Sequence, residues 1–234
     1  ADRHAKDQND LIKKYRTAAG HPEVDMAVDE IVNESIVVPQ DGDDQVVELN
    51  LGRVKISAAV KKRCQEEFDG ILNMMAFNER CHDMFKNWYI DGRLYHHLVV
   101  DTANMKQGIQ EIRFVDALKI RKVRYVQKTD KNVDNIELVN RVKEFYIFDD
   151  KIENDKKQLN VTDASKGSAI QLSNDSVSYI TSGLLDEGKG KVVSHLHKAL
   201  RPINQLRMME DSLIIYRLAR APERRIFYVD TGNL

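Results

Sequence analysis

Apolar residues recur at steps of three and four positions through most of the first 90 residues. This spacing places side chains on one face of an α-helix, and it predicts a series of helices separated by turns. Gly20 and Pro22 divide the first two, because glycine commonly follows a helix and proline suits a first helical turn. Ser57 and Asn78 are the expected N-caps of the next two. The predicted helices span residues 8–19, 22–36, 57–75 and 78–90.

The pattern changes to alternation after Gly92, and alternating apolar and polar residues are typical of half-buried strands. Residues 46–56, around Gly52, show a weaker alternation that predicts a short hairpin. Two polar segments, 129–140 and 155–168, interrupt the strand region and are expected to be surface excursions. The strands are expected at 93–101, 108–116, 118–128, 141–150, 169–173 and 176–183.

Helical spacing returns near the end of the chain and predicts one long helix from about Val193 to Arg220. Ser194 is its candidate N-cap and Pro222 its expected stop. Pro202 lies inside the pattern, so a bend or a helix start near Arg201 is also expected. The apolar stripe consists of Leu196, Leu200, Ile203, Leu206, Met209, Leu213 and Tyr216, and the basic residues outside it are Lys198, Arg201, Arg207, Arg217 and Arg220.

Composition narrows the class of protein without naming a function. Of the 234 residues, 42% are hydrophobic and 31% are charged, which is typical of a folded chain. No apolar run approaches the ~20 residues of a membrane helix, and the opening residues lack the apolar segment of a secretory signal. The formal net charge of -1 restricts any nucleic-acid contact to a local surface. Cys64 and Cys81 are expected to be free buried thiols in a reducing compartment, with a disulfide as the lesser alternative.

One local motif favours nucleotide binding. Residues 183–190 match GxxxxGK, the spacing of a phosphate-binding loop, between a predicted strand and a helix. Gly190 nevertheless stands where a magnesium ligand is needed, and Asp186 and Glu187 would place negative charge beside the phosphates. A nucleotide-binding ATPase is therefore an alternative function, and loss of ATP binding on Lys189→Ala would support it.

The remaining candidate chemistry points to ordinary structural roles. His96 and His97 are neighbours on a strand and face opposite ways, so they cannot chelate one metal ion. His195 and His197 diverge by about 200° on a helix, and no nucleophile motif is present. These residues offer no catalytic residue, no metal site and no cofactor site, so the favoured expectation is a protein that is not an enzyme, with the ATPase as the alternative.

The sequence resembles the portal proteins of contractile-tailed bacteriophages of the T-even type. Four segments carry the resemblance, and the last is long and specific. Residues 128–141 and 151–168 match the family poorly. The matching segments are PEVDMAVDEIVNESIV at 22–37, NWYIDGRLYHH at 87–97, GIQEIRFVDALKIRKVR at 108–124, and LHKALRPINQLRMMEDSLIIYRLARAPERRIFYVDTGNL at 196–234.

The resemblance implies an α+β fold: a helix-rich wing with small antiparallel sheets at 1–190, a first stem helix at 191–221, and the start of a clip at 222–234. The rest of the clip, the returning stem helix and the crown would lie beyond this piece of the chain. Portals of this kind are rings of about twelve subunits at one capsid vertex of the virion, and they are assembled inside the bacterial host. The implied partners are the large terminase subunit, the major capsid and scaffold proteins, neck proteins, and double-stranded DNA that passes through the channel of the ring without sequence-specific contacts. No small-molecule substrate is implied.

The resemblance also suggests roles for the basic residues of the long helix. Lys198, Arg201, Arg207, Arg217 and Arg220 become suspected channel or subunit-interface residues. Arg224, Arg225, Tyr228 and Asp230 become the suspected start of the clip that faces the terminase. A third interpretation, a sequence-specific DNA-binding module using this helix, predicts tight binding with a steep dependence on salt.

Overall fold

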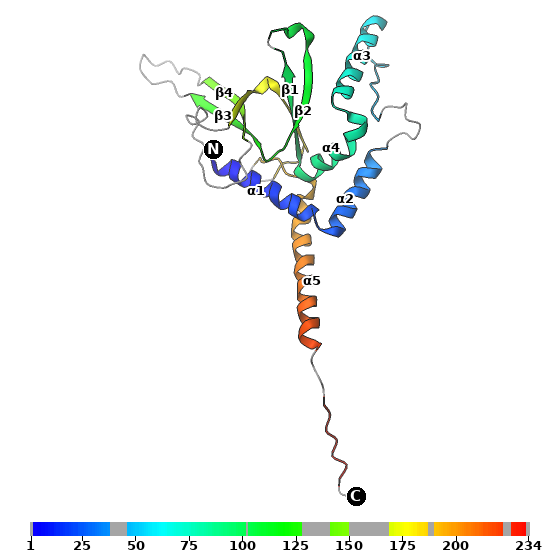
Figure 1. Ribbon diagram of the computed structural model, residues 1–234, viewed down its shortest axis with the longest axis vertical. Helices are drawn as coiled ribbons and strands as arrows, with labels where there is room; N and C mark the ends of the chain where they lie inside the picture. Colours follow the sequence, from blue (N-terminus) through cyan, green and yellow to red (C-terminus); the bar gives the residue numbers. More distant parts are fainter. Residues whose placement is uncertain are drawn as a thin grey trace. The chain divides into compact units, whose positions relative to one another are not determined.

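The computed structural model describes residues 2–37, 46–101, 103–127, 141–149, 169–186, 190–221 and 226–232. The chain divides into two compact units, Ala1–Leu196 and His197–Leu234. The first holds a group of helices and two small sheets, and the second is built on one helix (Figure 1). This is the α+β class that the sequence predicts.

The helices of the first unit follow the predicted apolar spacing closely. Gly20 ends the first helix by donating its N–H to the Arg16 carbonyl at 3.1 Å, and Pro22 opens the second. The helices α1, α2 and α4 contact one another, and α3 contacts α4. Their bounds are Asp2–Ala19 for α1, Pro22–Ser35 for α2, Ala58–Met74 for α3 and Phe77–Asp91 for α4.

The strands form two three-stranded antiparallel sheets, ordered β2-β1-β6 and β3-β4-β5 among the described residues. Residue Tyr95 of the first sheet lies opposite both Val115 and Tyr179. Short 3-10 helices lie at Met105–Gln107 (η1), Asn174–Ser176 (η3) and His195–Ala199 (η4). The strands are Arg93–Val100 (β1), Ile109–Val115 (β2), Ile120–Gln127 (β3), Arg141–Phe148 (β4), Ile170–Ser173 (β5) and Val177–Thr181 (β6).

One apolar core joins the two sheets and α1. Tyr95 of β1 stacks on Tyr179 at 4.7 Å between ring centroids and meets the edge of Tyr146, from the other sheet, at 6.2 Å. Ile12 of α1 packs into the same cluster with 1% of its surface exposed. Because the sheets and α1 contribute to one core, they hold one another in place. The buried members are Ile12, Tyr95, Val115, Ala117, Ile120, Tyr146 and Val177.

The second unit contains α5, which spans Leu200–Arg220, followed by an extended segment at 226–232. No residue of α5 is buried. The helix begins next to Pro202, so the predicted start near Arg201 is confirmed and the predicted continuous helix from Val193 is wrong. Proline lacks the N–H that a helix interior needs, but it is tolerated in the first turn. The 21 residues give a length of about 32 Å at 1.5 Å per residue.

Three other expectations differ from the structure. Residues 46–56 contain no strand, because Gly52 donates its N–H to the Asn50 side chain at 3.0 Å and the chain turns there. The cap of α4 is Ala76 in the left-handed conformation, while the Asn78 side chain accepts a hydrogen bond from Val46. Ser57 occupies the cap position of α3, but its side chain makes no capping hydrogen bond.

Both cysteines are free, as predicted, yet only Cys81 is buried. Cys64 is exposed because α3 contacts little besides α4, so most of its apolar stripe remains open to solvent. None of the described helices has both the length and the apolar character needed to cross a membrane.

Candidate functional site

The segment just before α5 is held by a short antiparallel turn. Asp186 donates its N–H to the Lys191 carbonyl at 2.9 Å, and Val193 donates to Leu184 at 3.0 Å. Leu185 and Val192 form a bridge between the two arms. Gly190 is in the turn, with a φ of 59°, and η4 follows residues 191–194. A phosphate-binding loop needs a helix to begin directly at its end, and the described flanks of 183–190 lack this arrangement. Lys189 lies outside the described residues.

Gly92 lets the C-terminal end of α4 approach this segment. Its φ of 70° is left-handed, and its N–H donates to the Trp88 carbonyl at 2.9 Å, which closes the helix. A Cβ at this position would lie 2.8 Å from the backbone N and Cα of Ser194 and from the Val193 carbonyl oxygen. The position needs glycine for two reasons, the backbone conformation and the close approach.

Polar side chains from three elements fasten residues 192–196 to the first unit. Ser194 Oγ donates to the Tyr89 carbonyl at 2.9 Å and accepts the Leu196 N–H at 3.0 Å, so this buried serine caps η4. Ser182 Oγ donates to the Val193 carbonyl at 2.6 Å. Arg93 Nη2 donates to the Val192 carbonyl at 2.8 Å. Together with Gly92, these residues form what we call the junction.

Aromatic stacking adds to the junction at His195. Its ring stacks on Tyr89, with centroids 4.9 Å apart and planes 7° apart, and it contacts Trp88 at 5.1 Å. These two aromatic residues come from the last turns of α4. Trp88 and Tyr89 therefore act in packing here, as their positions on an apolar helix face indicate.

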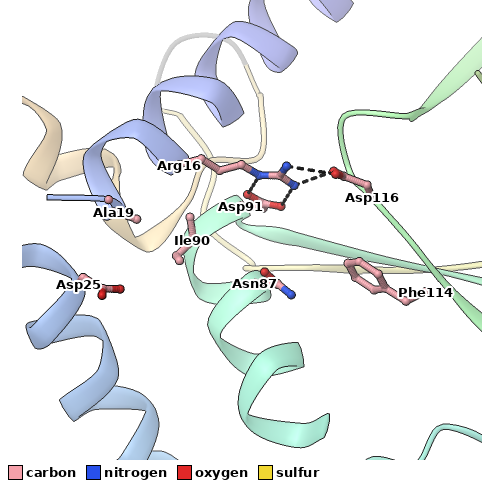
Figure 2. Close-up of a pocket in the computed structure, with 9 residues that line it drawn as sticks. Arg16, Ala19, Asp25, Asn87, Ile90, Asp91, Phe114 and Asp116 are labelled. Carbon is pink, nitrogen blue, oxygen red and sulfur yellow. Dashed lines mark hydrogen bonds and ion pairs between the residues drawn. The ribbon is translucent and has the colours of Figure 1, made fainter. Parts of the chain in front are cut away.

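A partly buried ion network lies where α1, α4 and the end of β2 meet (Figure 2). Arg16 donates to both Asp91 oxygens, at 3.0 and 2.7 Å, and to both Asp116 oxygens, at 3.2 and 2.6 Å. These residues line an open cavity of about 390 Å³ that Asp25, Asn87 and Phe114 also line. All three guanidinium nitrogens of Arg16 donate to these two carboxylates, so the network links α1, α4 and the end of β2. We call Arg16, Asp91 and Asp116 the joint.

The two carboxylates of this network respond differently to their surroundings. Burial raises the pKa of Asp91, which is 3% exposed, above its ordinary value, and Arg16 only partly offsets this. Burial acts in the same direction on Asp116, but hydrogen bonds from Arg16 and from the Leu118 N–H outweigh it and lower the pKa. Hydrogen bonding to Asp91, with help from Asp116, raises the pKa of Arg16, so the guanidinium stays charged.

The helix α5 exposes apolar side chains on every side. Taking 100° per residue, Leu213 and Ile215 lie about 200° apart around the helix axis, and both are more than half exposed. A helix that is apolar all round is normally buried. In this unit by itself it is not, so its surface is suited to contacts on more than one side. The exposed apolar residues are Met208, Met209, Leu213, Ile214, Ile215, Tyr216 and Leu218.

The family model described as "Bacteriophage T4-like portal protein (Gp20)" matches residues 8–234. The chain belongs to this family. It is 37% identical over 227 residues to the portal protein of Vibrio phage KVP40, covering 96% of this chain and 43% of that protein. It is 34% identical over 229 residues to the portal protein of Salmonella phage ViI, covering 96% of this chain and 40% of that protein. The chain therefore spans less than half the length of these curated relatives.

The suspected channel residues of this portal-family chain do not form one stripe. Relative to Arg201, the others on α5 lie at about 240° for Arg207, 160° for Arg217 and 100° for Arg220. All four are exposed, and the Arg220 guanidinium lies over the Tyr216 ring at 4.6 Å. Lys198 is exposed within η4. The basic residues are therefore distributed around α5, among the apolar ones.

The suspected clip residues are only partly described. Tyr228 is 90% exposed in the extended segment, and Asp230 accepts the Gly232 N–H at 3.0 Å. Arg224 and Arg225 lie outside the described residues. Sequence reasoning missed Arg16, Asp116 and Ser182, which the structure brings to the joint and the junction. A signal existed for Arg16, because it follows the buried Ile12 at helical spacing and a cation beside an apolar stripe indicates a buried carboxylate partner.

Proposed function

We propose that this chain is the wing, the first stem helix and the start of the clip of a ring-shaped portal at one vertex of a phage capsid. The wing would be residues 1–190, the stem helix 191–221 and the clip 222–234. Twelve or so copies would enclose a channel for double-stranded DNA and would serve as the starting point for head assembly. Membership of the portal family supports this role, and the part of the protein beyond this chain would complete the channel.

The observation that carries the proposal is the exposed, all-round apolar surface of α5. A dimer would bury one side of such a helix, but a ring places a neighbour on each flank of every copy. Burying a Leu, Ile or Met side chain is worth roughly 1.5–3 kcal/mol, so the four Leu and Ile residues and the two Met residues of this surface supply a strong driving force for assembly. The proposed occupants are the neighbouring stem helices and the returning helix of the same protein.

The distributed basic residues suit a conduit better than a specific DNA reader. A channel must let DNA slide, so it needs weak contacts to the phosphate backbone and no base recognition. The formal net charge of -1 for the whole chain is consistent with weak binding. Because Arg201, Arg207 and Arg217 point in different directions, we propose that some of them face neighbouring subunits and others the channel.

The proposed partners follow from this role. The large terminase subunit would dock on the clip near Tyr228 and Asp230 and would supply the ATP hydrolysis for packaging. Capsid and scaffold proteins would surround the wing during assembly inside the host cell, and neck proteins would bind after packaging. The mature location would be the virion.

Negative-stain imaging of the full-length protein tests the proposal. We expect end-on rings with a central hole and about twelve subunits. Leu213→Lys and Ile215→Lys, placed on opposite sides of α5, should each reduce ring formation, because each puts a charge into a subunit contact. Asn73→Lys, at an exposed position of α3, is the control and should assemble normally. A monomeric full-length protein, or a loss of rings with only one of the two α5 variants, would contradict the proposal.

A further inference from the structure

The charges of the first unit are segregated although the whole chain is nearly neutral. Helix α2 carries five carboxylates and no lysine or arginine. Strand β3 shows the opposite pattern, with Arg121, Lys122 and Arg124 and no carboxylate. Figure 1 shows α2 and the β3–β4 pair on opposite sides of this unit. We call Glu30 and Glu34, which lie about 40° apart around α2, the acidic flank, and Lys122 and Arg124 of β3 the basic flank.

Contacts within the unit leave a surplus of charge on each flank. On the side of α2 that faces α4, one lysine, Lys86, serves two carboxylates, Asp25 at 2.8 Å and Asp29 at 2.6 Å, and so leaves Glu30 and Glu34 without a cation. Glu30 and Glu34 are exposed and have no ion-pair partner in the described part of the chain. The acidic flank therefore keeps a net negative charge.

The basic flank shows the reverse arrangement. One carboxylate, Glu144 of β4, serves two cations, Lys122 at 2.7 Å and Arg124 at 3.7 Å. Lys122 is 42% and Arg124 is 66% exposed, and the two side chains are on the same face of the strand because they are two positions apart. The strand also has no partner on its outer edge among the described residues. The basic flank therefore keeps a net positive charge that a further carboxylate could approach.

We propose that the acidic flank of one copy docks on the basic flank of the next copy around the ring. The inference rests on the proposed function, and it names the wing surfaces that meet. A closed ring uses a heterologous contact, in which two different patches on opposite sides of each copy are complementary. Surplus charges of opposite sign on opposite sides meet this requirement. Two like copies turned face to face would instead place acid against acid, so the same charges oppose a twofold dimer.

These contacts set register and direction more than overall affinity. Exposed ion pairs are individually weak and are screened by salt. Complementary patches mainly steer the encounter and exclude wrong arrangements. The apolar surface of α5 would supply the affinity, while the wing charges would make each copy add in one orientation.

Charge reversal in the full-length protein tests the proposal. The acid-flank variant is Glu30→Lys with Glu34→Lys, and the basic-flank variant is Lys122→Glu with Arg124→Glu. Each should lower the fraction of protein in rings by at least about tenfold at a concentration where wild type is half assembled. Native mass spectrometry and negative-stain imaging measure this fraction. Matched controls on α3 change the same charges: Glu66→Lys with Glu67→Lys, and Lys62→Glu with Arg63→Glu, and these should assemble as wild type does.

Two combinations separate lost contacts from lost folding. One chain carrying all four flank substitutions has both flanks exchanged, so its rings should return to within about twofold of the wild-type yield. An equimolar mixture of the two single-flank variants should also form rings, because contacts between unlike variants pair either two reversed flanks or two wild-type flanks, and both pairings join opposite charges. Such rings must alternate, so mass spectrometry should find an even number of subunits in them.

The outcomes also separate this proposal from the proposed function. If wild type forms no rings, the proposed function fails and this inference falls with it. If wild type forms rings and the flank variants assemble equally well, the portal role stands and these flanks are not the wing contact. Failure of both the four-substitution chain and the mixture would equally overturn the docking proposal. Recovery in both, with loss in each single-flank variant, is the expected result.

Discussion

Replacing Gly92 by alanine tests whether the end of α4 and the segment before α5 are as closely packed as the structure indicates. The φ of 70° alone costs an L-residue about 1–2 kcal/mol. The added Cβ would also lie 2.8 Å from three backbone atoms of Val193 and Ser194, which must move. Forcing an extra carbon into a packed site costs a further ~1–3 kcal/mol. We therefore expect Gly92→Ala to lower the free energy of unfolding by about 2–5 kcal/mol.

Gly108→Ala is the matched control, because Gly108 has a φ of 75° and nothing lies within 4 Å of its added Cβ. It should lose only the conformational part, about 1–2 kcal/mol. Urea unfolding followed by circular dichroism compares the free energies of unfolding of the two variants. In thermal unfolding their melting temperatures should differ by roughly 2–12 °C. Equal losses would refute the reasoning, since they would mean that residues 193–194 move aside at no cost.

Three further substitutions test the joint, the junction and the first sheet. Arg16→Met leaves Asp91 as an unpaired buried charge and should lower the free energy of unfolding by about 3 kcal/mol, the low end for buried pairs because the Arg16 side chain is 35% exposed. Adding Asp91→Asn and Asp116→Asn to the same chain should restore stability, and a loss that persists would contradict this account. Ser194→Ala should lower the free energy of unfolding in urea by about 1–3 kcal/mol, because the Tyr89 carbonyl loses the hydrogen bond that Ser194 Oγ donates. An unchanged urea midpoint would argue against this role of Ser194. Burial lowers the pKa of His96 in the folded chain, so on acidification the unfolded chain binds a proton at a higher pH than the folded chain does. Stability should therefore fall as the pH drops from about 6.5 toward the folded-state pKa. His96→Gln should remove this part of the pH dependence, and an unchanged pH profile would contradict the account.

The periodic elements could be predicted because they bury a regular face. Helix α2 packs Val28 and Val32 inward, and the strands β1 to β4 lie within a few residues of their predicted positions. The errors fall where regular burial is absent. Residues 46–56 alternate in polarity but make no sheet, and α3 has a well-formed apolar stripe whose Val60 is nevertheless 49% exposed. An amphipathic pattern predicts that a helix forms. It does not predict which part of the fold, or which partner, covers the apolar face of that helix.

The junction could not be predicted, because its contacts join positions far apart in sequence. The sequence correctly predicts that a helix ends just before Gly92. Nothing near Gly92 in the sequence indicates that Ser194, more than 100 residues later, lies against it. The apolar surface of α5 is also wider than the sequence predicts. Its spacing indicated one buried stripe, yet residues such as Met208 and Ile215 lie outside that stripe and extend the apolar surface around the helix.

The pairing of β1 with β6 has a consequence for how the chain folds. Strands β2, β3, β4 and β5 all lie between these two partners in the sequence, so β1 pairs with β6 across a chain segment that contains the whole second sheet. Closing a loop of about 76 residues costs roughly 4 kcal/mol of chain entropy, which must be repaid by contacts formed elsewhere. The local β1–β2 and β3–β4 hairpins should therefore form first in folding, and β6 should dock late. Ser182 and residues 184–193 follow β6 directly in the sequence. The segment before α5 should therefore become ordered only after β6 has docked, in the last stage of folding of the first unit.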